Sequence, residues 1–249
     1  MGKFSAFLLF FLSTAMLMAQ QIVPAQIVAE HQQFAKFESN SIFSPASRSG
    51  ITVPEEVTEY QVLDLNRAAL KNLVSSADEN ISLTLPVNDR ESIELQLVEQ
   101  KMEGLIIRES DGNRYVKYNP GRHYQGIIKG KPGSLVALSF FEDDVMGFVS
   151  DPRNDGNLVI GKMQDKSENF IVYRDDKLLG KLPMECGTED SGEAYKAEDL
   201  FHSSGDRALS DCVKMYFEVD NNIFTNKGGM TPTINYITGL YNQVKTLYN

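Results

Sequence analysis

Hydrophobic and polar residues alternate along most of the segment from residue 56 to residue 187, in runs of about six residues. Because successive side chains of a strand point to opposite faces, this alternation predicts half-buried β-strands. Turn-forming residues separate the runs, and no helical stretch long enough to cover a parallel sheet lies between them. We therefore expect a mostly β, antiparallel, strand-rich domain. Its predicted strands cover residues 59–65, 81–86, 92–98, 104–108, 115–118, 124–130, 134–141, 144–149, 156–161 and 169–174.

Several short sequence features between the predicted strands indicate a helix cap and turns. Asn66 precedes a short apolar-periodic run and predicts the N-cap of a helix over residues 67–75. Asp-Gly-Asn at 111–113 predicts a hairpin turn. Lys-Pro-Gly at 131–133 predicts another turn, in which proline fixes φ and glycine accepts a positive φ. By contrast, residues 20–55 are polar, serine-rich and without a sustained period, which predicts a flexible lead-in with no core.

The C-terminal residues 212–249 follow a different pattern. Residues 212–220 alternate like a strand, and a helix is predicted from Thr231, with Pro232 at its first position. One strand and one helix cannot bury their own apolar faces, so we expect residues 212–249 to be the first part of a domain whose remainder is missing. Residues 188–211 are acidic and poor in apolar residues, which predicts an exposed linker where proteolytic nicking concentrates. The expected apolar face of the helix consists of Ile234, Ile237, Leu240, Tyr241, Val244, Leu247 and Tyr248.

The first 19 residues have the pattern of a secretory signal peptide. Lys3 supplies a positive charge, residues 4–18 are almost wholly apolar, and Ala19 is a small residue suited to cleavage. The apolar run is too short to predict a membrane span, so we expect a secreted chain without stable membrane insertion. The formal net charge is −10 and no cluster of Lys and Arg occurs, which argues against nucleic acid as a partner.

Cysteine is scarce, with two residues in 249. Cys186 is followed by Gly187, so a sharply turning backbone could present a single thiol to a target. A thiolate is a strong zinc ligand, and a thiolate in the open position of a catalytic zinc would block the chemistry there. Cys186 is therefore a candidate metal ligand. The alternative is a disulfide between Cys186 and Cys212, as is usual for an exported protein.

Residues 124–139 read Tyr-Gln-Gly-x-x-x-Gly-x-Pro-Gly-Ser-x-Val-Ala-Leu-Ser, and residues 147–149 read Gly-Phe-Val. This pattern resembles the propeptide of reprolysin-like zinc metalloproteases, the adamalysin branch of the metzincins. Residues 213–220 and 233–244 are similar to the first strand and first helix of the family's catalytic domain. The resemblance implies that residues 212–249 are the truncated first part of an α/β zincin-type domain, and that maturation cleavage occurs in the linker 188–211. The resemblance implies that residues 56–187 are a propeptide domain that assists folding. It further implies that Cys186 is the cysteine-switch ligand that keeps the zinc protease latent.

The resemblance also implies zinc as the cofactor of the full-length protease, the chain's own catalytic domain as an intramolecular partner, and protein substrates for the mature enzyme. Such a metalloendopeptidase needs H-E-x-x-H-x-x-G-x-x-H, with the histidines as ligands and the glutamate as general base. The three histidines, His31, His123 and His202, lie far apart in the sequence. This chain alone should therefore be inactive. The alternative function is a secreted β-rich binding or adhesion module without protease activity.

Overall fold

The computed structural model describes residues 23–47, 50–110, 114–165, 167–180 and 215–248. Its main feature is a ten-stranded sheet with the strand order β1-β4-β5-β8-β9-β10-β11-β12-β3-β2. Within this sheet β1 pairs in parallel with β4, and every other neighbouring pair is antiparallel, which confirms the mostly β class. The strands are β1 (Glu38–Asn40), β2 (Phe43–Pro45), β3 (Tyr60–Leu65), β4 (Asn80–Pro86), β5 (Ser92–Glu99), β8 (Arg122–Ile128), β9 (Lys131–Phe140), β10 (Val145–Ser150), β11 (Asn157–Lys162) and β12 (Phe170–Arg174).

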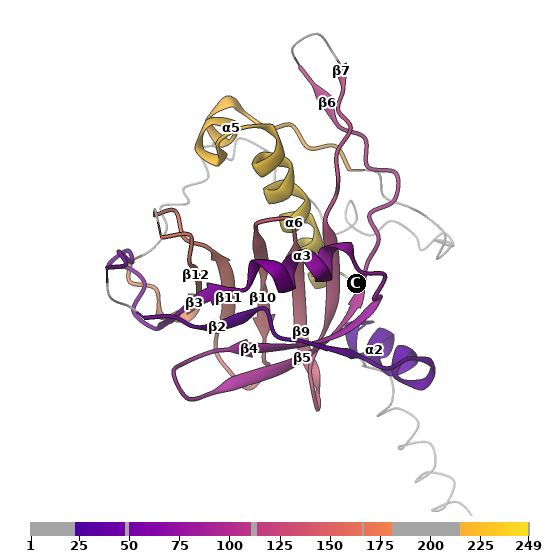
Figure 1. Ribbon diagram of the computed structural model, residues 1–249, viewed down its shortest axis with the longest axis vertical. Coiled ribbons are helices and arrows are strands. Elements are labelled where there is room, and N and C mark those ends of the chain that lie inside the picture. The colour runs from indigo at the N-terminus through magenta and orange to yellow at the C-terminus, as the bar shows by residue number, and fades with distance from the viewer. Residues whose placement is uncertain (1–22, 48–49, 111–113, 166, 181–214, 249) are drawn as a thin grey trace, which may run out of the picture.

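The sheet is strongly curled (Figure 1). β1 and β2 follow one another in the chain but lie at opposite edges of the sheet, and β2 contacts β4, so the curl brings the two edges together. The main apolar core lies on the inner face. The helix α3 (Arg67–Ser75) adds Leu70 and Leu73 to this core. The predicted cap of α3 is confirmed, because the side chain of Asn66 accepts a hydrogen bond from the Ala69 backbone N at 3.0 Å.

The prediction that residues 20–55 contribute no core was wrong. The helix α2 (Val23–Phe34) packs on the outer face of the sheet, where Ala25 and Val28 lie against Val98 and Ile127. Further along, β1 and β2 belong to the sheet, and Phe43 joins the main core. These elements show no sequence period because α2 buries only a narrow stripe of small residues and each strand has only three residues.

Two helices follow the sheet in the chain, α5 (Asn221–Lys227) and α6 (Met230–Tyr248). α6 lies along the outer face of β8, β9 and β10 (Figure 1). The predicted C-terminal helix is thus confirmed. The strand predicted over 212–220 is wrong for residues 215–220, which have no regular secondary structure. Asp220 instead caps α5, since its side chain accepts a hydrogen bond from the Ile223 backbone N at 2.8 Å.

A second, two-stranded sheet consists of β6 (Arg108–Glu109) and β7 (Arg114–Tyr115), which pair antiparallel. This hairpin projects away from the body of the molecule (Figure 1). The predicted hairpin is confirmed, but its strands are shorter than expected, because residues 104–107 form no strand. The predicted turn residues 111–113 lie outside the described residues.

The β8–β9 hairpin accounts for the glycine and serine residues of the sequence motif at 124–139. The predicted turn at 131–133 lies too late in the chain: Gly130 has the positive φ, of 76°, and Pro132 is inside β9. A Cβ atom on Gly126 would lie 1.9 Å from the carbonyl oxygen of Gln96 on β5. Ser134 fixes the irregular register that follows, because its Oγ accepts a hydrogen bond from the Ile128 backbone N at 2.7 Å. The motif therefore encodes backbone geometry.

We expect Gly126→Ala to lower the free energy of unfolding by about 3 kcal/mol, because the new methyl group meets a backbone oxygen that no rotamer change can move. Urea denaturation followed by circular dichroism measures this change. Gly161→Ala is the matched control, since a Cβ atom on Gly161 has nothing within 4 Å. Equal midpoints for the two variants would show that the β5–β8 contact is looser than described.

Candidate functional site

The candidate zinc ligand lies outside the described residues. This holds for Cys186, for its alternative partner Cys212, for the predicted signal peptide 1–19 and for the whole predicted linker 188–211. Within the described part of the chain, no group of three or more His, Cys, Asp or Glu side chains is placed to hold a metal ion. Two other polar regions can be described in atomic detail, a pocket beside Arg122 and the contact between α6 and the sheet.

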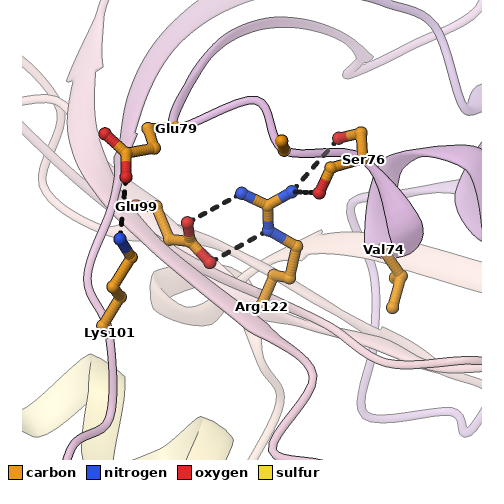
Figure 2. Close-up of a pocket in the computed structure, with 7 residues that line it drawn as sticks. Val74, Ser76, Glu79, Glu99, Lys101 and Arg122 are labelled. Atoms are coloured by element: carbon orange, nitrogen blue, oxygen red, sulfur yellow. Dashed lines mark hydrogen bonds and ion pairs between the residues drawn. The ribbon is translucent and has the colours of Figure 1, made fainter.

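The pocket beside Arg122 has a volume of about 360 Å³ and lies between the end of α3 and the strands β5 and β8 (Figure 2). The side chains of Arg122 and Glu99 are only 8% and 13% exposed. They form a bidentate ion pair, with Arg122 Nε 2.9 Å from Glu99 Oε1 and Arg122 Nη2 2.7 Å from Glu99 Oε2. Such fork-to-fork pairing is the strongest geometry for an arginine and a carboxylate. The lining residues are Val74, Ser76, Ala77, Glu79, Glu99, Lys101 and Arg122.

The remaining N–H groups of Arg122 bind backbone carbonyls. Nη1 donates to the carbonyl oxygen of Leu73 at 3.3 Å and to both the carbonyl and hydroxyl oxygens of Ser76, and Nη2 donates to the carbonyl of Asp78 at 2.8 Å. The carbonyls of Leu73 and Ser76 lie at the end of α3, where the following helical turn supplies no donors; the Leu73 carbonyl also accepts from the Ser76 backbone N at 3.3 Å. Arg122 therefore ties the end of α3 to β5 and β8. Burial lowers the pKa of Arg122, but the hydrogen bond to Glu99 and the charge interactions with nearby groups together outweigh it and leave the pKa raised.

At the rim of the pocket, Lys101 Nζ lies 2.7 Å from Glu79 Oε1 (Figure 2). Their hydrogen bond lowers the pKa of Glu79 and raises the pKa of Lys101. Each charged side chain that lines the pocket is thus paired with another that lines it. An incoming ligand would have to break an existing pair, so we interpret this region as a structural clamp.

We expect Arg122→Met to lower the free energy of unfolding by about 3 kcal/mol, because it leaves the Glu99 carboxylate buried without its cation and removes the hydrogen bond to the Ser76 carbonyl. Chemical denaturation measures the loss. The control Lys101→Met removes an exposed pair and should leave the midpoint unchanged. If Arg122→Met were as stable as the wild type, the clamp would have no structural role.

The second region lies under α6, on the outer face of β8 and β9. His123 and Ser139 face each other across the two strands, and both are buried. His123 Nε2 is 2.8 Å from the carbonyl oxygen of Pro120, and His123 Nδ1 is 2.8 Å from Ser139 Oγ. Because a carbonyl only accepts, Nε2 carries the proton of the neutral ring and Nδ1 accepts from the Ser139 hydroxyl. Burial lowers the pKa of His123 to about 4.

Asn242 of α6 extends this hydrogen-bonded chain. Its Nδ2 lies 3.3 Å from Ser139 Oγ, 3.2 Å from the Leu138 carbonyl oxygen and 3.3 Å from the Tyr124 carbonyl oxygen. Its Oδ1 accepts a hydrogen bond from Gln125 Nε2 at 3.3 Å. The amide of Asn242 is therefore satisfied almost wholly by the sheet, which identifies it as the central polar contact of α6.

A second contact lies towards the start of α6. The hydroxyl of Tyr118 donates to Asn235 Oδ1 at 2.5 Å. Burial raises the pKa of Tyr118 to about 12, so this hydroxyl stays protonated and remains a donor.

The sheet-facing side of α6 differs from the predicted apolar face. Of the seven residues in the predicted apolar face, Ile234 is the one that is buried. Leu240, Leu247 and Tyr248 are exposed. Asn and Thr residues at helical spacing indicate the side of α6 that faces the sheet, and a prediction based on apolar residues alone does not include them. The buried residues of α6 are Thr233, Ile234, Asn235, Thr238, Gly239, Asn242 and Thr246.

No protein-family model matches this chain, and a search of curated proteins finds no match either. None of the helices in the described ranges is both long enough and apolar enough to cross a membrane. A function for this chain therefore has to follow from its residues and their geometry.

The pKa of His123 predicts a specific dependence of stability on pH. The folded protein keeps this ring neutral down to about pH 4, whereas an unfolded histidine takes up a proton near pH 6.5. The unfolded state therefore binds more protons between these values, and the stability that this neutral ring provides, about 3 kcal/mol, is lost as the pH falls from about 6.5 to about 4.

Urea denaturation of the wild type and of His123→Gln at pH 7, 6, 5 and 4 tests this expectation. Carboxylates titrate in both proteins, so the difference between the two pH curves isolates His123. We expect the wild type to lose more stability than His123→Gln over this range. Parallel curves would show that His123 is not buried as a neutral ring.

Proposed function

We propose that this chain is the N-terminal part of a secreted zinc metalloprotease zymogen. In this proposal the curled sheet is the propeptide, and residues 212–249 begin the protease domain. The observation that carries it is the separation of the two parts. The described residues form three apolar clusters: the main core, the contact under α2, and a third cluster of Val62, Met163 and Ile171. Every residue of these clusters belongs to residues 25–173. A helix of the same folding unit would bury its apolar face in one of these clusters.

The open side of the C-terminal part supports the same proposal. Leu240, Leu247 and Tyr248 are 40%, 60% and 87% exposed on α6. Large apolar side chains gathered on one surface mark a face that other protein covers. In the proposed zymogen, this cover is the remainder of the protease domain.

The proposed latency mechanism places the thiolate of Cys186 on the catalytic zinc. The zinc itself would be held by an H-E-x-x-H motif encoded after residue 249, where the thiolate would occupy the position needed by water. An isolated antiparallel bridge between Val57 and Leu178 holds the chain shortly before this cysteine, and beside it the Leu179 backbone N donates to the Glu56 carbonyl at 2.8 Å. Cys186 lies seven residues further along and so stays within about 25 Å of an anchored point.

One observation favours the alternative, a secreted binding or adhesion module. The projecting β6–β7 hairpin carries Tyr115 and follows Ile106, and both side chains are exposed, as in a surface that binds another protein. This alternative gives no reason for a C-terminal part that lies outside all the described apolar clusters. The zymogen proposal gives a reason for that separation.

The precursor encoded by the whole gene tests the proposal. We expect an H-E-x-x-H motif after residue 249, and we expect Cys186→Ala to show peptidase activity before the linker is cut, at least ~10-fold above the wild type, because an empty zinc position admits water. Hydrolysis of a quenched fluorescent peptide measures this activity.

Cys212→Ala is the matched control and should remain latent. If Cys186→Ala and Cys212→Ala behave alike, or if mass spectrometry finds the two cysteines joined in the secreted precursor, the switch mechanism is excluded. The absence of a zinc motif from the rest of the gene would instead support the binding module.

A further inference from the structure

Several of the residues through which α6 contacts the sheet are threonines, yet their hydroxyl groups need no hydrogen-bond partners on the sheet. Thr233, Thr238 and Thr246 each donate their hydroxyl to the backbone carbonyl four residues earlier in the chain, at 2.8 Å. Their hydroxyls are therefore satisfied by the helix itself. The threonine methyl groups remain to contact the sheet. This side of the helix can therefore pack on the protein or be exposed to water at little cost in free energy.

Gly239 lets the helix approach the sheet closely. A Cβ atom at this position would lie 2.4 Å from the sulfur of Met146 on β10. Close approach of the backbone brings Asn242, one turn later, within hydrogen-bonding distance of the carbonyls of Tyr124 and Leu138. The helix and the sheet are thus complementary in shape around Gly239 and in hydrogen bonding around Asn242.

Both the sheet-facing side of α6 and the outer face of the sheet carry polar side chains, which lowers the cost of separating the helix from the sheet. Gln125, His123 and Ser139 on the sheet and Asn242 on the helix can all hydrogen-bond to water when the helix leaves. Interfaces between parts that associate and separate are more polar than permanent ones. An apolar contact of the kind found under α2, where Val28 packs on Val98 and Ile127, would not come apart so readily.

We propose that the outer face of β8, β9 and β10 is a docking surface that recognises α6 by its polar side and holds it without a covalent connection. The biological setting rests on the proposed function: in the zymogen, this surface keeps residues 212–249 bound to the sheet after the linker at 188–211 has been cut. Asn242 is the recognising residue of the helix and Gln125 its counterpart on the sheet.

The test uses the full 249-residue chain with a recognition sequence for a site-specific protease inserted into residues 188–211. After cleavage, gel filtration shows whether the two pieces co-elute, and dilution of the complex gives its Kd. We expect the wild-type pieces to co-elute. We expect Asn242→Leu to raise the Kd by about 10- to 100-fold, because it removes the hydrogen bonds of Asn242 with the Gln125 side chain and with two sheet carbonyls in a buried contact.

Asn222→Leu on α5 is the matched control, because it makes the same substitution at an exposed position of the same piece and should leave the Kd unchanged. Gln125→Leu tests the sheet side, and its effect should not add fully to that of Asn242→Leu, since the two side chains share a hydrogen bond. Circular dichroism of each uncut variant verifies that the sheet is folded.

Two results would overturn the docking proposal: wild-type pieces that separate as soon as the chain is cut, or the same Kd for Asn242→Leu and Asn222→Leu. Neither readout involves zinc or Cys186. A complex that persists while Cys186→Ala shows no premature activity would leave the docking surface standing and remove the cysteine switch. Premature activity of Cys186→Ala with pieces that separate at once would do the reverse.

Discussion

Burial of β8 on both of its faces is the constraint on which the rest of the structure depends. All seven residues from Arg122 to Ile128 are buried. The inner side chains Tyr124 and Ile128 belong to the main core, while Ile127 packs under α2 and Gln125 lies under α6. A strand in this position must satisfy each polar group from within the protein, since water reaches neither face. The polar residues of β8 accordingly organise the clamp at α3 and the contact with α6.

The same constraint explains why the glycine-containing motif could be found in the sequence but not interpreted from it. The alternating pattern predicted nearly every strand of the large sheet, because half-buried strands place apolar residues at every second position. It could not show that Gly126 lies against the Gln96 carbonyl, since that neighbour is on another strand. The turn was placed at Pro132 and Gly133 for a related reason: proline suggests a turn locally, whereas here it lies inside β9 and Gly130 supplies the positive φ.

The polar site under α6 could not be predicted from the sequence, for a different physical reason. His123 and Ser139 meet because they are partners in the β8–β9 register, and Asn242 reaches them from a helix far along the chain. Nothing in the local pattern around any of them indicates such a meeting. The helix itself was predictable from its period, but the period identified its apolar side, and tertiary packing placed the opposite side against the sheet. Propensity and periodicity determine that a helix forms, and they do not determine which neighbour it has.

A helix with two usable sides suits a chain that changes partners. The polar side of α6 has groups that either the sheet or water can satisfy, because its threonine hydroxyls bond within the helix and Asn242 carries most of the bonds to the sheet. The apolar side, with Leu240 and Leu247 exposed, gains free energy only when protein covers it. In the proposed zymogen, the apolar side therefore belongs to the permanent neighbour, the protease domain, and the polar side to the temporary one, the propeptide. The reverse arrangement would leave an apolar face in water after the propeptide has gone, and such a face promotes aggregation.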